Sequence, residues 1–265
     1  MHTETHTPSP SPVRVFWAPG CTSCLRTKEF LTRRGIEFES VNVAAQPAAM
    51  QELTALGARS IPVVSRGTGW VYAQSLNDVT DFLGIAAAEG ARLSPAVLAQ
   101  RVNIILPKAM GFVRQMSDDV LDGPFRDSWA PPRGLAHHVF RIVEAFLESV
   151  QTPCELGYDQ IMAGTHEVVP GQDVAGYGQQ VLDRFNTWWA GASGADFSTP
   201  MDTYYGPQTL HEVLERTTWH SAQHARQLMF VIQSLGGRVV DPLTTADLAN
   251  LPLPEKAWDD APQAA

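Results

Sequence analysis

The sequence predicts an α/β domain followed by an all-α bundle of four helices, in a chain of 265 residues. Over residues 13–85, short β-branched and aromatic runs alternate with helical stretches, which is typical of an α/β domain. From residue 94 onward, apolar residues recur every three or four positions over long stretches, which indicates helices alone. The expected organisation is a disordered polar lead (1–12), the α/β domain (13–85), a linker of small residues (86–93), the helical bundle (94–240) and a tail that packs on the bundle (241–265).

The composition is that of a globular protein with a sizeable core and an acidic surface: 44% of the residues are hydrophobic and 18% are charged. The net charge of −9 argues against nucleic acid or an anionic membrane as the partner. We expect no transmembrane helix, because the apolar runs are short, and no secretory signal, because the first residues lack its basic and apolar segments. Three cysteines, two of them as Cys21-x-x-Cys24, suit a reducing compartment, so a cytoplasmic location is expected.

The α/β domain begins with a strand over residues 13–17, which Pro19 and Gly20 interrupt directly before Cys21. A helix is expected over residues 22–34, with Gly35 as its C-terminal cap. The other expected elements are a strand over 37–43, a helix over 47–56, a hairpin of strands 61–65 and 70–73, and a helix over 76–83.

The two cysteines of this domain form a candidate redox pair. Cys21 is expected at the N-terminal end of a helix, where free backbone N–H groups and the helix dipole lower the pKa of a thiol. Cys24 lies one turn further along and can resolve a mixed disulfide by attacking the first sulfur. Two other interpretations are an inactive domain and a zinc half-site, but no second Cys or His pair occurs between residues 25 and 136.

The CTSC motif after a first strand, with Ser60-Ile61-Pro62-Val63-Val64 about forty residues later, resembles a glutaredoxin of the thioredoxin fold. The resemblance implies a cis proline at Pro62, packed beside the active-site cysteines, with Ile61 and Pro62 as candidate thiol-binding residues. Asn77 and Asp78 fall where glutaredoxins hold glutathione, although the glycine pair of that family segment is absent here. The resemblance therefore implies thiol–disulfide chemistry, with glutathione as the thiol.

Four helices are expected in the second domain. The first spans residues 94–121, with a kink or break near Asn103 because Pro107 lies in its middle. The others are expected over 135–150, 174–190 and 210–235. The loop over 153–171 carries Cys154, interpreted as a partly buried thiol or a third redox partner, and His166, interpreted as exposed.

Three histidines on two of these helices form a candidate metal site. His220 and His224 are one turn apart on or beside an apolar stripe, so both imidazoles can bind one divalent metal. His138 shares the apolar face of its helix and is the candidate third ligand, whereas His137 shares a face with charged residues and is expected at the surface. The alternative is that each histidine is a hydrogen-bonded core residue.

The helix order and the segments LAHHVFR (135–141) and TWHSAQHARQL (218–228) resemble the DinB/YfiT-like family of metal-binding bundles. That resemblance implies zinc or nickel held by His138, His220 and His224. It also implies an S-transferase or isomerase that uses mycothiol, bacillithiol or glutathione. Zinc is the first choice for three neutral imidazoles with an open position, and nickel, iron or manganese also fit.

These expectations combine into a metal-dependent S-transferase, isomerase or lyase that acts with a low-molecular-weight thiol and carries a fused glutaredoxin-like reductase domain. The partners expected are that thiol and an electrophilic or disulfide substrate, and a homodimer is one expected assembly. The alternative is a thiol–disulfide oxidoreductase or redox sensor, in which the bundle is a metal-binding or dimerisation module or only a scaffold.

Overall fold

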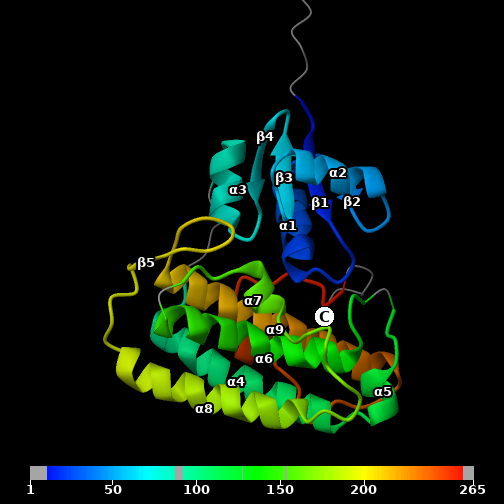
Figure 1. Ribbon diagram of the computed structural model, residues 1–265, viewed down its shortest axis with the longest axis vertical. Coiled ribbons are helices and arrows are strands. Elements are labelled where there is room, and N and C mark those ends of the chain that lie inside the picture. Colours follow the sequence, from blue (N-terminus) through cyan, green and yellow to red (C-terminus); the bar gives the residue numbers. More distant parts are fainter. Residues whose placement is uncertain (1–10, 87–91, 127, 153, 259–265) are drawn as a thin grey trace, which may run out of the picture. The chain divides into compact units, whose positions relative to one another are not determined.

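The computed structural model describes residues 11–86, 92–126, 128–152 and 154–258, and the chain divides into two compact units, residues 1–88 and 89–265 (Figure 1). The predicted disordered lead over 1–12 lies outside the described residues except for its last two. Most of the predicted linker over 86–93 and the end of the predicted tail over 241–265 also lie outside them.

The first unit is built on a four-stranded sheet of strand order β2-β1-β3-β4. β1 (Val13–Trp17) pairs in parallel with β2 (Phe38–Asn42) and antiparallel with β3 (Val63–Arg66), which pairs antiparallel with β4 (Gly69–Tyr72). The β-branched and aromatic residues of the predicted strands supply this sheet, and the thioredoxin-like α/β prediction is confirmed.

Helices cover both faces of this sheet (Figure 1). Because side chains alternate along a strand, Val13 and Val15 of β1 face one core and Phe16 faces the other. The first core includes residues of α1 (Thr22–Arg33) and α3 (Leu76–Leu83), and the second includes residues of α2 (Pro47–Ala55). The hydrophobic alternation in the sequence therefore produces a three-layer α/β/α unit.

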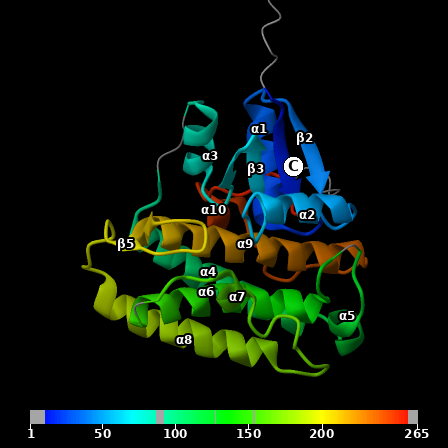
Figure 2. The same ribbon diagram turned by 45° about the horizontal axis from the view of Figure 1, so that its top comes forward.

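The second unit is a four-helix bundle, as predicted. Its long helices are α4 (Pro95–Arg114), α6 (Pro132–Gln151), α8 (Val174–Ala192) and α9 (Leu210–Ser234). α9 packs on α4 and α6, and α8 packs on the same two helices (Figure 2). Each helix therefore has two neighbours, and the apolar stripes meet in one core.

The first bundle helix differs from its prediction in two ways. α4 continues through Pro107 without a break, and it ends at Arg114 instead of near residue 121. Its last turn tightens, since the amides of Gln115 and Met116 donate to the carbonyls of residues 112 and 113, and α5 (Asp118–Asp122) then begins. The length and hydropathy of α4 would also suit a membrane span, but half of that window is buried inside the structure, as in the core helix of a bundle.

Shorter segments close the bundle. These are α7 (Tyr158–Met162), the two-residue strands β5 (Pro200–Met201) and β6 (Gln208–Thr209), and α10 (Thr245–Leu248). The β5–β6 pair was not expected from the sequence. The described part of the tail packs on the bundle as predicted, since Leu251 and Trp258 belong to its core.

Candidate redox site and metal centre

The redox site lies where β1 ends and α1 begins. Cys21 is the N-cap residue of α1, and the backbone N–H of Cys24 donates to Sγ of Cys21 at 3.2 Å. The two cysteines form a disulfide with a Cα–Cα distance of 5.2 Å. Cys24 is fully buried, whereas Cys21 is partly exposed. Cys21 is therefore the sulfur that a substrate can reach.

A hydrogen-bonded chain holds the proline loop of this unit. The peptide bond between Ile61 and Pro62 is cis, as the resemblance implies. The side-chain amide of Gln74 donates to the carbonyl of Ile61 at 2.9 Å, and Arg26 donates to the carbonyl of Gln74 at 2.9 Å. The buried α1 residue Arg26 thus ties the helix of the CxxC motif to the loop that carries the cis proline.

Asn77 and Asp78 lie in the first turn of α3, whose N-cap is Ser75. The backbone N–H of Asp78 donates to the Ser75 hydroxyl at 3.3 Å. Asp78 is thus the acidic residue of a helix N-terminus, where a carboxylate is electrostatically stabilised. A role for both residues in binding a thiol stays a prediction.

Three histidines meet in the core of the bundle. The structure brings together His138 of α6 with His220 and His224 of α9, and their ligand nitrogens lie within 4.8 Å of one another. All three side chains are buried. Nε2 of His220 and Nε2 of His224 are 3.1 Å apart, close to the roughly 3.3 Å that separates two nitrogens bound to one tetrahedral zinc ion. The spacing therefore fits a single metal ion.

Polar side chains lie at Nδ1 of two of these rings. Nδ1 of His224 lies 2.7 Å from the side-chain oxygen of Gln227, so Nδ1 carries the proton and the lone pair of Nε2 faces the cluster. The hydroxyl of Thr165 lies 3.5 Å from Nδ1 of His138. Both partners are buried.

The electrostatics of the site favour the neutral form of two of the imidazoles. Burial lowers the pKa of His224 to about 4. Burial, followed by the neighbouring His224, His137 and Arg216, holds the pKa of His138 well below its ordinary value. Neutral nitrogen donors are what a divalent metal requires, so the residues present fit a three-histidine metal site that leaves a coordination position for another ligand.

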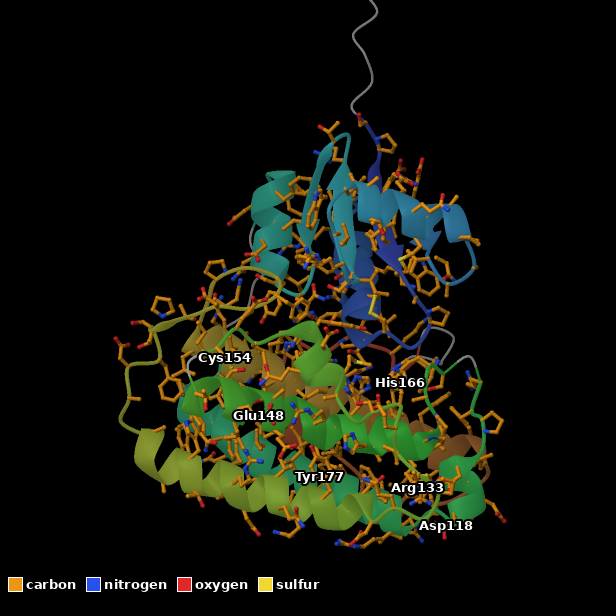
Figure 3. The ribbon with its side chains drawn as sticks, in the orientation of Figure 1. Asp118, Arg133, Glu148, Cys154, His166 and Tyr177 are labelled. Atoms are coloured by element: carbon orange, nitrogen blue, oxygen red, sulfur yellow. A yellow bond between two sulfur atoms is a disulfide. The ribbon has the colours of Figure 1, made fainter. Side chains whose placement is uncertain are left out.

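Trp129 and Arg216 border the cluster and were not singled out from the sequence. The Trp129 ring lies 5.2 Å from that of His138 and 6.3 Å from that of His224, edge to face, and the side chain is partly exposed. His166 is exposed, as predicted, and packs against the same tryptophan at 5.5 Å (Figure 3). Trp129 lies in a loop rich in helix-breaking residues before α6, where no periodic pattern could point to it. Arg216 lies four residues before His220 on the same helix, and this i, i+4 spacing could have been found in the sequence.

The prediction that His137 lies at the surface is wrong. His137 is 8% exposed, and its ring stacks on that of Tyr177 from α8 at 4.7 Å. Burial lowers the pKa of His137. The face was expected to be solvated because it carries charged residues, but the segment that includes α7 and Gly164 covers it, and Gly164 lies against the His137 ring.

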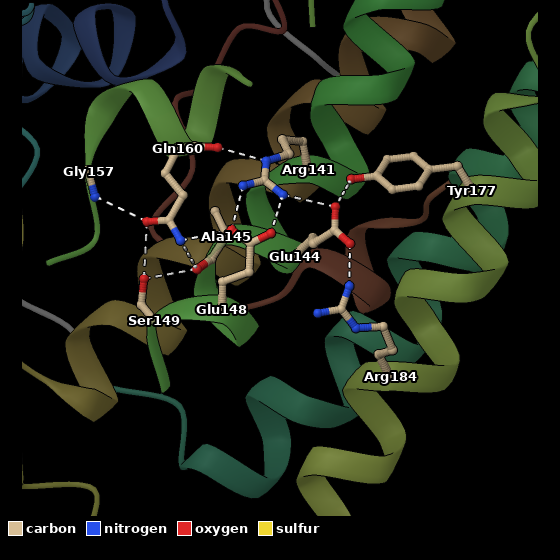
Figure 4. Close-up of polar contacts among 9 residues, drawn as sticks. All are labelled: Arg141, Glu144, Ala145, Glu148, Ser149, Gly157, Gln160, Tyr177 and Arg184. Carbon is tan, nitrogen blue, oxygen red and sulfur yellow. Dashed lines mark hydrogen bonds and ion pairs between the residues drawn. The ribbon is translucent and has the colours of Figure 1, made fainter. Parts of the chain in front are cut away.

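The charged residues of that face form a network around the buried Arg141 (Figure 4). Arg141 donates to Glu144, to both carboxylate oxygens of Glu148 and to the carbonyl of Gln160 in α7. Glu144 also accepts hydrogen bonds from Tyr177 and Arg184 of α8. The network thus links α6, α7 and α8, and it pairs the buried Arg141 with two carboxylates.

Cys154 is free and exposed, so the interpretation as a partly buried thiol is wrong.

Residues 13–68 match the glutaredoxin family model. The gene 56 protein of Mycobacterium phage L5 is 44% identical over 59 residues, which are 22% of this chain and 57% of that protein. The glutaredoxin-like proteins NrdH of Salmonella typhimurium and Escherichia coli K12 are 40% and 36% identical over 55 residues, 21% of this chain and 68% of each relative. This chain thus spans little more than half of the length of the phage protein.

Among solved structures, YfiT from Bacillus subtilis, described as a probable metal-dependent hydrolase with an unusual four-helix bundle topology, is similar with a TM-score of 0.45. It is 19% identical, and the match covers 58% of this chain and 96% of that one.

The fold and the CxxC disulfide define the first unit as a thiol–disulfide oxidoreductase domain of the thioredoxin class. Through this unit the chain belongs to the glutaredoxin family.

Proposed function

We propose that the protein is a metal-dependent enzyme that acts on a low-molecular-weight thiol, as a transferase, isomerase or lyase, and that its glutaredoxin-like unit reduces the disulfides of this chemistry. One observation carries the proposal: three buried imidazoles with ligand atoms within 4.8 Å of one another occur in the same chain as a CxxC disulfide. His138, His220 and His224 are the ligands. A metal bound there would act as a Lewis acid that lowers the pKa of a thiol at its open position.

The surrounding residues prepare the site for this ligand. Gln227 holds the orientation of the His224 ring, so little rearrangement of that ring accompanies metal binding. Trp129 supplies a partly exposed aromatic wall next to His138 and His224. Such a wall suits the apolar part of a small electrophile and excludes water from one side of the site.

The redox step uses the cysteines of the first unit. In the reduced protein, the thiolate of Cys21 attacks one sulfur of a substrate disulfide, releases one thiol and forms a mixed disulfide. Cys24 loses its proton and attacks Sγ of Cys21, which releases the second thiol and closes the 21–24 disulfide. The two electrons come from the cysteine pair, and an external thiol reductant returns them.

The test compares variants in an S-transfer assay with glutathione and 1-chloro-2,4-dinitrobenzene. His220→Ala removes a metal ligand and is expected to abolish turnover. His211→Ala is the matched control, because His211 lies on the same helix but contacts the carbonyl of Leu93 instead of the cluster. Wild-type turnover in His220→Ala contradicts the metal-dependent step.

The redox unit is tested separately with a glutathione mixed disulfide as substrate. Cys21→Ser is expected to stop its reduction, while Cys154→Ser, which changes an exposed cysteine outside the CxxC motif, is expected to leave the rate unchanged. If Cys21→Ser alone loses activity and no thiol is transferred by any variant, the alternative holds, and the protein is an oxidoreductase whose bundle serves another role.

A further inference from the structure

Arg216 stands next to the candidate metal centre. It lies four residues before His220 and eight before His224, so the three side chains project from one side of α9. The spacing places the Cα atoms of Arg216 and His220 about one helical turn apart.

The surroundings of Arg216 leave its charge without a counter-ion. The residue is 6% exposed. One of its terminal nitrogens donates to the hydroxyl of Tyr204 at 3.1 Å, and its guanidinium carbon lies 5.1 Å from the ring centre of Tyr205 and 5.8 Å from that of Tyr204. Within the described ranges it forms no ion pair, and its buried Nε has no hydrogen-bond acceptor. Neutral phenols and aromatic faces do not neutralise a cation.

A buried guanidinium without an anion is costly, so such groups occur where an anion is bound. The planar fork of arginine matches a carboxylate, which can accept from Nε and a terminal nitrogen at once. The orphan Nε and the engaged terminal nitrogen of Arg216 fit this arrangement, with the tyrosines supporting the guanidinium from its other sides. The positive charge also acts on His138, which places Arg216 within electrostatic reach of the cluster.

We propose that Arg216 is the carboxylate-binding residue of this site. It binds a carboxylate of the small molecule that occupies the open position beside His138, His220 and His224. The inference rests on the proposed function and narrows its substrate class: the thiol, or the electrophile that joins it, carries a carboxylate. Glutathione meets this requirement, and an uncharged thiol does not.

The first experiment measures thiol binding by the full-length, reduced protein loaded with cobalt(II), using the near-ultraviolet thiolate-to-cobalt absorption. The probes are 3-mercaptopropionate and its neutral counterpart 3-mercaptopropionamide. The wild-type protein is expected to bind the acid at least tenfold more tightly than the amide. Arg216→Met is expected to bind both alike, and Arg216→Lys, which keeps the charge and loses the fork, to show an intermediate preference.

A second arm locates the carboxylate when the thiol itself is uncharged. With 3-mercaptopropionamide saturating the cobalt, propionate is titrated and its effect on the cobalt spectrum is followed. Propionate binding that Arg216→Met abolishes assigns the carboxylate to the second substrate, whereas a preference in the first arm assigns it to the thiol. Either result supports the proposal.

The outcomes separate this inference from the proposed function. If the protein binds no cobalt, or cobalt-loaded protein binds neither thiol, the proposed function fails and the inference fails with it. If cobalt and both thiols bind, but the affinities for the acid, the amide and propionate are the same in wild type and in the Arg216 variants, only the assignment of Arg216 is overturned. Cobalt stoichiometry and circular dichroism of Arg216→Met and Arg216→Lys show whether each variant is folded. If Arg216→Met does not fold, the thiol preference of Arg216→Lys tests the assignment of Arg216.

Discussion

Gln227 determines which nitrogen of His224 faces the cluster, because it accepts the Nδ1 proton at 2.7 Å from a buried position. Gln227→Leu removes that acceptor and is expected to lower the affinity for zinc by about 10- to 100-fold. Gln227→Glu retains an acceptor and is expected to stay close to wild type. Competition with a chromophoric chelator measures both.

The matched control for this prediction is Gln233→Leu, an exposed glutamine on the same helix. It is expected to leave the zinc affinity unchanged. Equal affinities in Gln227→Leu and Gln233→Leu would show that the Gln227 contact does not orient His224.

At the scale of residues, helical phase predicted which three histidines meet in the core, but not which residues surround them. His138 was separated from His137 because only one of them continues the apolar stripe of 135–150. The same reasoning placed His137 at the surface, and it failed because Tyr177 and Gly164, which are distant in sequence, cover that face. Trp129 and Thr165 lie in irregular segments without a period, so no local pattern places them beside a ligand.

At the scale of elements, the closest approach of α8 to α6 is tested at Gly178. A Cβ atom at Gly178 would lie 2.7 Å from the ring of Phe140, which is fully buried. Gly178→Ala therefore forces the helices apart and is expected to lower the free energy of unfolding by about 1–3 kcal/mol. Urea unfolding followed by tryptophan fluorescence measures the change.

Gly191→Ala is the control on the same helix, since a Cβ atom there meets nothing within 4 Å. Alanine favours a helix over glycine, so this variant is expected to be unchanged or more stable by up to about 1 kcal/mol. A Gly178→Ala protein as stable as Gly191→Ala would contradict the packing of these helices.

The Arg141 network predicts how stability responds to acid. Hydrogen bonding to Arg141 lowers the pKa of Glu148 below its ordinary value of 4.5. The folded pKa lies below the unfolded pKa, so the stabilisation is present above about pH 4.5 and is lost as the pH falls through the folded pKa. Urea unfolding at pH 6 and pH 3.5 is expected to show a smaller difference for Glu148→Gln than for wild type.

The control for the acid response is Glu155→Gln, which changes an exposed carboxylate outside the network. It is expected to keep the wild-type difference between the two pH values. If Glu148→Gln keeps that difference too, the carboxylate does not contribute to acid sensitivity.

Element types and order followed from periodicity with few errors, because each long helix carries an apolar stripe and each strand alternates. The end of α4 was misjudged because the apolar period of residues 113, 116 and 120 continues across the turn before α5. Periodicity records which residues are buried, and it cannot show that two consecutive helices share one buried face. The β5–β6 pair was missed because two-residue strands have no period.

At the scale of the whole molecule, the two units have separate cores, so metal and reductant are expected to act on different parts of the chain. Zinc at one hundred times its dissociation constant should stabilise the helical unit by about 2.7 kcal/mol. In thermal unfolding experiments, zinc is expected to raise only the transition temperature of the helical unit. Dithiothreitol, which opens the 21–24 disulfide, is expected to change only the transition temperature of the first unit.

His220→Ala provides the control for that experiment, because it lacks a ligand and should show no zinc-dependent shift. A shift of the same size in His220→Ala would place the zinc elsewhere.

The most direct test of the central claim is the metal content and X-ray absorption spectrum of the purified protein. The three-histidine centre predicts one divalent ion per chain, bound by three imidazole nitrogens at about 2.0–2.1 Å if the ion is zinc. It also predicts that His138→Ala, His220→Ala and His224→Ala each lose the ion while remaining folded. Full metal content in all three variants, or a spectrum without imidazole ligands, would contradict the account.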